Sequence, residues 1–380
     1  MSGPDAVVIG AGPNGLFAAA RLARAGLRVE VLEAAARPGG ALWTVESAGA
    51  GFLHDVGAAF VAFRDSVAFR GLDLEARGLR WALGTFESAH PAPDGTCPGI
   101  ARDLDRSAPT FGTDADRWRA LCAFHRGIEP QMLAFLGPLP QVVPALRMGP
   151  IRGLRLLAAF LRSSGGFARA TFATEAARRV IPSMGLHVDV GPDDPFGTAV
   201  CWMLALRATT AGFAVPVGGA AAITRALIAD LEAHGGTVRT GVRVDRVRVV
   251  DGAVVGVRAG GDEIDARRVI ADTSAASLYL DLVGPDHLPG FVTRAMRAFP
   301  QGWGTFKLDL SLSAPVPWTA EVARASAVVH LGDALDDLAR FTAEVRGGAL
   351  PSRPYLVIGQ QSLVDPSRAP AGHHTLYVYT

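Results

Sequence analysis

Lysine is almost missing from this sequence of 380 residues. Lys307 is the single lysine among 37 basic residues, and all the others are arginines. This bias, together with abundant alanine and glycine, is typical of a GC-rich genome rather than of a function. The formal net charge is only +1. No imbalance of charge therefore points to nucleic acid as a partner.

Cysteine and long apolar runs are scarce as well. Cys97, Cys122 and Cys201 lie far apart, and without a closely spaced pair the sequence predicts neither a metal site nor a redox-active dithiol. No apolar run reaches the roughly 18 residues of a membrane-spanning helix. The first apolar run begins near the N-terminus and leaves no room for a signal peptide. We therefore expect a soluble, cytoplasmic protein.

A glycine-rich motif lies between two apolar runs near the start of the chain. Residues 6–9 predict a buried parallel strand, and residues 10–15 (GAGPNG) follow it directly. Residues 16–25 have the apolar spacing of a helix, and residues 27–32 predict a second strand that ends at Glu33. Strand, GxGxxG, helix, strand and acid in this order predict a dinucleotide-binding βαβ unit.

Each part of this motif has a physical role. Gly10 permits a tight turn, Gly12 lets the backbone approach a pyrophosphate, and Gly15 lets the helix pack closely on the strand. The pyrophosphate binds at the helix N-terminus, where free N–H groups and the helix dipole favour negative charge. Glu33 is expected to accept hydrogen bonds from a ribose diol. The predicted contacts in this motif are Gly10, Gly12, Pro13, Asn14, Gly15 and Glu33.

The residues that follow indicate which nucleotide binds. A glycine doublet, Gly39–Gly40, comes six residues after Glu33, and residues 51–60 (GFLHDVGAAF) predict a strand and a turn. With the first motif, they resemble the phytoene desaturase (carotenoid dehydrogenase)-like flavoproteins, and among these the pyridine nucleotide-disulfide oxidoreductase domain-containing proteins. Amine oxidases are more distant relatives. The resemblance implies FAD as the cofactor, with further contacts at Gly39, Gly40, Ala41, Gly57 and Ala58.

A second region, residues 216–275, supports the same resemblance. Residues 220–233 predict a helix, and residues 242–250 and 253–259 predict strands joined by a two-residue turn, Asp251–Gly252. In the family, such a helix and meander return the chain to the FAD-binding domain, and Val244 falls at the place of a valine that contacts adenine. An ordinary core position in a strand explains Val244 equally well.

Lys307 is the candidate catalytic residue. It lies between Phe306 and Leu308 in an alternating strand that is predicted to begin at Gly302. A half-buried lysine needs a partner. The resemblance to amine oxidases implies a lysine that holds a water at flavin N5, where a cation stabilises negative charge. The alternative is a lysine on an edge strand that faces solvent.

Residues 147–162 combine arginines with apolar residues at helical spacing. One interpretation is a basic amphipathic surface for peripheral membrane contact, which would suit a lipid substrate. The interpretation that we favour from sequence is a lid helix packed on its own domain, with solvated arginines.

These observations predict an α/β protein with two domains. The first is a Rossmann-like FAD-binding domain, with a parallel sheet and a ββα meander, assembled from residues 1–85 and 205–275. The second is an α+β substrate domain with a mixed sheet, assembled from residues 86–204 and 276–380. The family's C-terminal FAD-binding segment is not found before Thr380, so we expect either a fragment or a partly lost cofactor site.

The resemblance implies an FAD-dependent dehydrogenase that removes hydride from a small, apolar or lipid-like molecule. His54 and Asp55 are the titratable pair nearest the flavin by motif position, and we assign neither a catalytic role. Two alternatives stay open. One is a flavin amine oxidase-like enzyme, and the other is a non-catalytic interaction protein that keeps the fold.

Overall fold

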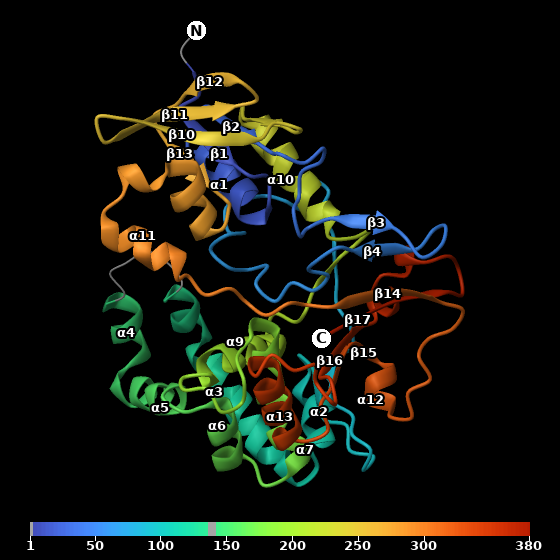
Figure 1. The fold of residues 1–380 in the computed structure, drawn as a ribbon. Coiled ribbons are helices and arrows are strands. Elements are labelled where there is room, and N and C mark those ends of the chain that lie inside the picture. The colour runs from blue at the N-terminus through green and yellow to red at the C-terminus, as the bar shows by residue number, and fades with distance from the viewer. Residues whose placement is uncertain (1–2, 136–141) are drawn as a thin grey trace.

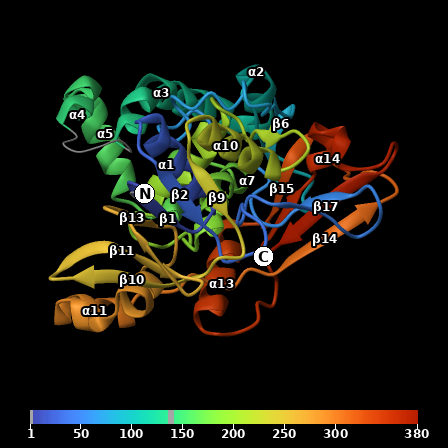
Figure 2. The same cartoon turned by 90° about the horizontal axis from the view of Figure 1, so that it is seen from above.

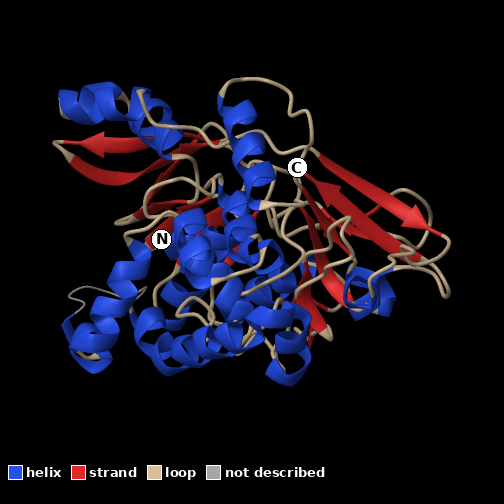
Figure 3. Ribbon diagram, turned by 90° about the horizontal axis from the view of Figure 1, so that it is seen from below, coloured by secondary structure: helices blue, strands red, loops and turns tan. Residues whose placement is uncertain are grey.

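The computed structural model of this protein describes residues 3–135 and 142–380. It has two regions (Figure 1). One contains a parallel sheet and an antiparallel meander, and the other contains most of the helices and a large mixed sheet. Seen from below, the meander and the mixed sheet lie at opposite sides of the molecule (Figure 3).

The parallel sheet has the strand order β13-β1-β2-β9. The strands are β1 (Ala6–Ile9), β2 (Val29–Leu32), β9 (Thr237–Arg239) and β13 (Val269–Ala271). Alternate residues of β1 face opposite sides of the sheet. Ala6 and Val8 pack against α1 and α10, while Val7 and Ile9 pack against the meander. This burial on both faces explains the continuous apolar run of residues 6–9.

Two helices cover one face of this sheet. They are α1 (Pro13–Arg24) and α10 (Ala221–Ala233), which lie side by side (Figure 2). The meander covers the other face and consists of β10 (Val244–Val250), β11 (Ala253–Ala259) and β12 (Asp262–Asp265). Asp251 and Gly252 join β10 to β11 with positive φ angles of 49° and 76°. This turn confirms the predicted hairpin, since both of its central residues need positive φ.

The mixed sheet has the strand order β14-β17-β16-β15-β6-β7. Its strands are β6 (Phe86–Ala89), β7 (Gly99–Ile100), β14 (Lys307–Leu312), β15 (Ser326–Leu331), β16 (Leu356–Gly359) and β17 (His374–Tyr379). β15 and β6 pair in parallel, and the other neighbours are antiparallel.

The helices of the second region pack on this sheet, most of them around one large core. They are α2 (Leu104–Ser107), α3 (Ala115–Ala134), α4 (Val142–Met148), α5 (Pro150–Phe160), α6 (Ser164–Thr171), α7 (Glu175–Arg178), α8 (Val180–Ser183), α9 (Thr198–Ala208), α12 (Glu321–Arg324), α13 (Leu335–Arg346) and α14 (Gln361–Val364). Trp118 and Trp202 are its largest buried side chains. A further helix, α11 (Gly290–Arg297), lies beside the meander (Figure 1).

Two pairs of short antiparallel strands lie outside the larger sheets. β3 (Thr44–Glu46) pairs with β4 (Leu53–Asp55), and β5 (Trp81–Ala82) pairs with β8 (Val215–Pro216). The parallel sheet thus takes its strands from residues 6–32 and 237–271, and the mixed sheet takes its strands from residues 86–100 and 307–379. The domain boundaries at residues 85, 205 and 275 stay a prediction.

The strand predicted to begin at Gly302 begins at Lys307 instead. Phe306 still exchanges two backbone hydrogen bonds with Thr380, at 3.0 and 3.1 Å. Before Phe306, the backbone N–H of Trp303 donates to the carboxylate of Asp189, at 2.9 Å, rather than to a neighbouring strand. The alternation of residue types in the sequence therefore begins before the backbone hydrogen bonds that form the strand.

Candidate functional site

The glycines of the first motif allow three backbone segments to meet at the start of α1. Gly10 has φ +94°, in the region that favours glycine. A Cβ added at Gly15 would lie 2.2 Å from the carbonyl oxygen of Gly10, so the helix could not approach the turn with any side chain there. Gly12 is the N-cap of α1 and, as a glycine, has no side chain with which to cap this end. Free N–H groups at such a helix end favour an anion.

Glu33 lies beside this turn, at the end of β2. Its two carboxylate oxygens accept hydrogen bonds from the backbone N–H groups of Ala11 and Ala35, each at 2.8 Å. These bonds fix the carboxylate at the mouth of the motif, and each oxygen keeps a further lone pair for a ligand. The contact between Glu33 and a ribose stays a prediction.

Asp272 is a residue of this site that the sequence analysis missed. It follows β13 directly, and its Oδ2 accepts a hydrogen bond of 2.9 Å from the backbone N–H of Gly15. An acidic residue directly after a third parallel strand was the available signal, because the C-terminal ends of such strands share one edge of the sheet. The carboxylate therefore lies at the helix end where the motif predicts the pyrophosphate.

The glycine doublet reaches the same turn. The N–H of Gly39 donates to the carbonyl of Ala11 at 2.8 Å. A Cβ added at Gly40 would lie 3.2 Å from the Cα of Gly12, and one added at Gly57 would lie 2.8 Å from Ala41. Gly12, Gly40, Ala41 and Gly57 therefore lie in one connected series of close backbone approaches, which leaves no room for side chains at these glycines.

Two other predicted positions differ in burial. Asn14, in the first turn of α1, is exposed. Val244 is only 7% exposed and packs in a cluster with Val7, Ile9 and Leu32. This burial supports the interpretation of Val244 as a core residue, and its contact with adenine stays a prediction.

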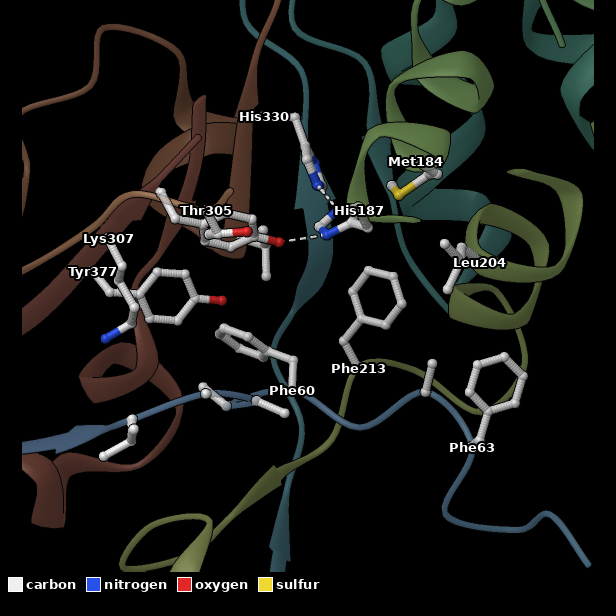
Figure 4. Close-up of a pocket in the computed structure, with 17 residues that line it drawn as sticks. Phe60, Phe63, Met184, His187, Leu204, Phe213, Thr305, Lys307, His330 and Tyr377 are labelled. Atoms are coloured by element: carbon white, nitrogen blue, oxygen red, sulfur yellow. Dashed lines mark hydrogen bonds between the residues drawn. The ribbon is translucent and has the colours of Figure 1, made fainter. Parts of the chain in front are cut away.

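A cavity of about 590 Å³ begins at Gly57 and Ala58 and extends toward the mixed sheet. Its walls are mainly aromatic and aliphatic (Figure 4). The large apolar residues that line it are Phe60, Phe63, Met184, Leu204, Phe213 and Val328. The polar side chains that line it are Thr305, Lys307, His187, His330, Tyr377 and Tyr379, and none of the described lining residues is acidic.

Lys307 lies at the edge of this cavity, beside Tyr377 (Figure 4). Its Nζ forms an ion pair with Asp309, two residues along the same strand, and lies 5.4 Å from the centre of the Tyr377 ring. The lysine side chain is 19% exposed, so it is neither buried without a partner nor a free cation in solvent. The structure therefore brings Lys307 to the same cavity as Gly57 and Ala58. Its role at flavin N5 stays a prediction.

His54 and Asp55 are both fully buried and lie in β4, which pairs with β3. Asp55 accepts hydrogen bonds from Thr44, from the N–H of Ala220 and from the guanidinium of Arg368, at 2.7 to 2.9 Å. These bonds connect three segments that are distant in sequence, which gives Asp55 a structural role. Burial lowers the pKa of His54.

A histidine and tyrosine chain in the cavity wall was also missed. The hydroxyl of Tyr379 is 2.5 Å from Nδ1 of His187, and Nε2 of His187 is 2.8 Å from Nε2 of His330 (Figure 4). Burial lowers the pKa of His187 to about 4 and that of His330 well below its ordinary value. Burial also raises the pKa of Tyr379 well above its ordinary value. All three groups are therefore neutral at pH 7. The available signal was the spacing of Tyr377 and Tyr379, which alternate in one strand and so share a face.

Two further absences hold for the described part of the chain. Residues 3–135 and 142–380 contain no cluster of His, Cys, Asp or Glu that could hold a metal ion. None of the helices within those ranges is long and apolar enough to cross a membrane.

Comparison with known proteins agrees with this geometry. Residues 8–69 match the family of NAD(P)-binding Rossmann-like domains, and residues 152–380 match the family described as flavin containing amine oxidoreductase. One similar protein is pyridine nucleotide-disulfide oxidoreductase domain-containing protein 2 of Rattus norvegicus, with 27% identity over 99% of this chain and 73% of that protein. Another is the all-trans-zeta-carotene desaturase of Myxococcus xanthus, with 26% identity over 98% of this chain and 71% of that protein.

A putrescine oxidase redesigned in its cofactor binding has a similar solved structure. Its TM-score is 0.61, and 99% of this chain aligns with 75% of that chain at 18% identity. A likeness at this identity shows the fold alone. It confirms the predicted Rossmann-like α/β architecture with a mixed substrate sheet.

The second family match covers more than half of the chain, and the glycine motif, the connected backbone approaches and the cavity suit a flavin at the same place. The confirmed predictions are therefore the cofactor, FAD, and the class of protein, an oxidoreductase. This chain belongs to the flavin containing amine oxidoreductase family and is similar to its phytoene desaturase-like members.

Proposed function

We propose that this oxidoreductase removes hydride from an apolar, lipid-like small molecule that binds in the cavity lined by Phe60, Phe213 and Leu204. The observation that carries the proposal is the chemistry of the cavity wall, which is apolar over most of its extent and has no acidic residue among the described ones. A cavity of about 590 Å³ is in the size range of small-molecule sites. The name of the desaturase from Myxococcus xanthus supports a substrate of this class.

FAD, when bound, would supply the hydride acceptor, and the protein would supply binding and orientation. The glycines of residues 10–15 and 39–40 and the carboxylate of Glu33 would hold its diphosphate and ribose. Gly57 and Ala58 would place the reactive end of FAD at the cavity mouth, where the Lys307 ammonium can stabilise negative charge. The aromatic side chains would exclude water from the reacting bond.

The fold of the putrescine oxidase raises an amine as the second candidate substrate. Phe60, Tyr377 and Tyr379 do form an aromatic group, with ring centres 6.1 and 5.7 Å apart along the series. An amine that binds as a cation, however, would meet the ammonium of Lys307 and no carboxylate among the residues that line the cavity. The charge of the cavity therefore favours the apolar substrate.

Anaerobic mixing of the FAD-loaded protein with each probe tests this choice. We expect zeta-carotene in phospholipid vesicles to bleach the oxidised-flavin absorbance, and putrescine to leave it unchanged. Empty vesicles are the control. Bleaching by putrescine alone would contradict the proposal and support the amine oxidase-like alternative.

We also propose that α4 and α5 bind the surface of an anionic membrane, from which such a substrate could be taken. Several apolar residues of this segment, which was expected from sequence to pack on its own domain, instead face solvent, although Met148 and Leu156 are buried. Ile151 is 82% exposed, Leu154 66% and Leu157 53%. An apolar stripe of this kind is a binding surface or an aggregation hazard.

The arginines around this stripe suit acidic lipids. Arg147, Arg152 and Arg162 are exposed beside it, whereas Arg155 stacks on Phe124 at 4.3 Å. Basic residues beside an inserted apolar face attract anionic headgroups. A flotation assay with phosphatidylserine-containing vesicles tests this contact, and a variant with Ile151→Ser and Leu154→Ser should lose binding. The control is Leu350→Ser, which removes another solvent-exposed leucine, 95% exposed, outside this segment. Equal binding by all three proteins would contradict the proposal.

A further inference from the structure

A groove of about 400 Å³ lies between α3 and α5, and no described residue lines both this groove and the substrate cavity. Each of the two segments contributes four residues at positions i, i+3, i+4 and i+7, the spacing of one helical face. They are Arg117, Ala120, Leu121 and Phe124 from α3, and Arg155, Ala158, Ala159 and Arg162 from α5 and the turn that follows it. The buried rings of Phe167 and Trp202 form the base of the groove.

Arg155 shows how the two helices run along the groove. Its guanidinium carbon lies 4.3 Å from the centre of the Phe124 ring. The other lining residues of α5 follow Arg155 in sequence, whereas those of α3 precede Phe124, so the two helices run in opposite directions. Arg162 therefore lies toward Arg117, about 10 Å from Arg155, because each residue of a helix rises about 1.5 Å.

The groove consequently has two different ends. Arg117 and Arg162 are both exposed and line one end. The other end is aromatic, since the ring of Trp202 lies 6.0 Å from that of Phe124 and 5.6 Å from that of Phe167, between ring centres. Between the ends, alanine side chains leave the space open.

The positive charge of the groove has little compensation from the protein. None of its described lining residues is acidic. Among the described residues, Arg155 and Arg162 form no ion pair with a carboxylate. Arg117 donates from one nitrogen to Asp114 at 2.7 Å and keeps its other N–H groups. A bound anion would relieve the repulsion among these guanidinium groups.

We propose that this groove binds a single-chain anionic amphiphile, with its phosphate or carboxylate headgroup at Arg117 and Arg162 and its hydrocarbon chain toward Phe124. A guanidinium donates to two oxygens of one phosphate or carboxylate, which suits the first end. The aromatic rings would remove the hydrocarbon from water, which suits the second end. A single chain is favoured because about 400 Å³ is near the lower limit of small-molecule sites.

The groove is also distinct from the exposed apolar stripe on α5. Ile151, Leu154 and Leu157 belong to that stripe, and none of them lines the groove. The proposal therefore does not rest on the proposed substrate or on the proposed membrane contact. Each of the three surfaces has its own residues, so each can be changed separately.

Isothermal titration calorimetry of the FAD-loaded protein with octyl phosphate tests this site, and bound FAD keeps the ligand from the pyrophosphate site. We expect one molecule to bind per chain, at least about 10-fold more tightly than inorganic phosphate or octanol. Equal affinity for inorganic phosphate would overturn the role of the apolar end. Equal affinity for octanol would overturn the role of the arginines, and no binding at all would overturn the whole proposal.

Arg162→Gln tests the position of the headgroup. The variant should bind octyl phosphate about 10-fold more weakly or worse, because a hydrogen bond between charged groups is lost. Arg162 is exposed, so the fold should be unaffected. Arg119→Gln is the matched control, because Arg119 is another arginine of α3 that pairs with Asp105 and does not line the groove. A loss of less than about 3-fold in Arg162→Gln, or an equal loss in the control, would overturn the proposal.

Ala120→Trp tests the groove itself. Ala120 is exposed, so a larger side chain there fills the groove without entering the core, and binding should be lost. Ala123→Trp, at an exposed position of α3 outside the groove, is the control and should bind normally. Normal binding by Ala120→Trp would overturn the proposal.

Two further variants separate this site from the other surfaces. Leu204→Trp fills the substrate cavity, and the double variant Ile151→Ser with Leu154→Ser removes the exposed stripe. Both should bind octyl phosphate as the wild type does, whatever their behaviour with zeta-carotene or vesicles. Loss of binding in either variant would assign the amphiphile to that other surface and overturn its assignment to the groove.

Discussion

The carboxylate of Asp272 accepts a hydrogen bond of 2.9 Å from the backbone N–H of Gly15, in the first turn of α1. This is the helix end at which the sequence motif places the pyrophosphate of FAD. One negative charge of the protein therefore lies where two negative charges of the cofactor are expected. The relationship makes the affinity for FAD sensitive to the charge of one residue outside the glycine motif.

Asp272→Asn should bind FAD more tightly, by about 10-fold, because the amide keeps an acceptor for Gly15 and removes the repulsion. A tenfold change corresponds to about 1.4 kcal/mol. Titration of apoprotein with FAD, followed by flavin fluorescence, measures the effect. Asp281→Asn, which removes an exposed acidic residue in the next helical segment, is the control. Weaker binding by Asp272→Asn would show that the carboxylate contributes favourably to cofactor binding.

Gly15→Ala should abolish stoichiometric FAD binding and lower the melting temperature. The added Cβ would lie 2.2 Å from the carbonyl oxygen of Gly10, so α1 must move away from the turn. Gly127→Ala is the matched control, because Gly127 is in α3 and a Cβ there meets nothing within 4 Å. The control should be neutral or stabilise the protein by up to about 1 kcal/mol. Normal flavin content in Gly15→Ala would contradict the role given to this glycine.

Glu33→Gln should weaken FAD binding by about 10- to 100-fold. The charged acceptor for the ribose is lost, which costs roughly 1.5–3 kcal/mol. The same fluorescence titration measures it, and Glu30→Gln is the control, because Glu30 is in the same strand and its carboxylate accepts a hydrogen bond from Arg239. Equal dissociation constants for Glu33→Gln and wild type would place Glu33 away from the ribose.

Lys307→Met should slow flavin reduction by about 10²-fold while flavin content stays normal. The change removes the only ammonium in the cavity wall and keeps the length of the side chain. The double variant Lys307→Met with Asp309→Asn controls for the unpaired carboxylate that the single change leaves. Recovery of the wild-type rate in the double variant would show that Lys307 acts by neutralising the charge of Asp309 rather than by stabilising charge on the flavin.

The stability of the protein should fall as the pH drops below 6.5. Burial lowers the pKa of His90 to about 3 and that of His187 to about 4, from an ordinary value of 6.5. Below pH 6.5 the unfolded chain therefore binds protons that the folded protein does not, and the free energy of unfolding decreases until the folded pKa is reached. Each such histidine contributes at most about 1.4 kcal/mol per pH unit.

Urea unfolding at pH 7.5, 6.5 and 5.5 measures this slope. His90→Gln should reduce the slope of the unfolding free energy with pH by about the contribution of one histidine. An unfolding free energy that is constant from pH 7.5 to 5.5 would mean that these rings titrate in the folded protein as they do in the unfolded chain.

Local sequence patterns were sufficient for the elements near the cofactor. The run of residues 6–9 and the Asp251–Gly252 turn each depend on neighbours in sequence, and both were predicted correctly. The chain from Tyr379 through His187 to His330 could not be predicted, because its members come together only when the mixed sheet and the 3-10 turn pack. The exposure of Ile151 and Leu154 was missed for a related reason. Helical spacing shows which residues share a face, but not whether another element covers that face.

The central claim is that an apolar substrate delivers hydride to FAD from the cavity lined by Leu204. The most direct test is the rate of anaerobic flavin bleaching by zeta-carotene vesicles in wild-type protein and in Leu204→Trp, which fills the cavity. We expect bleaching of the wild type and a loss of at least about 10-fold in the variant, with equal reduction of both by dithionite. Equal rates with zeta-carotene in both proteins, or bleaching only by putrescine, would contradict it.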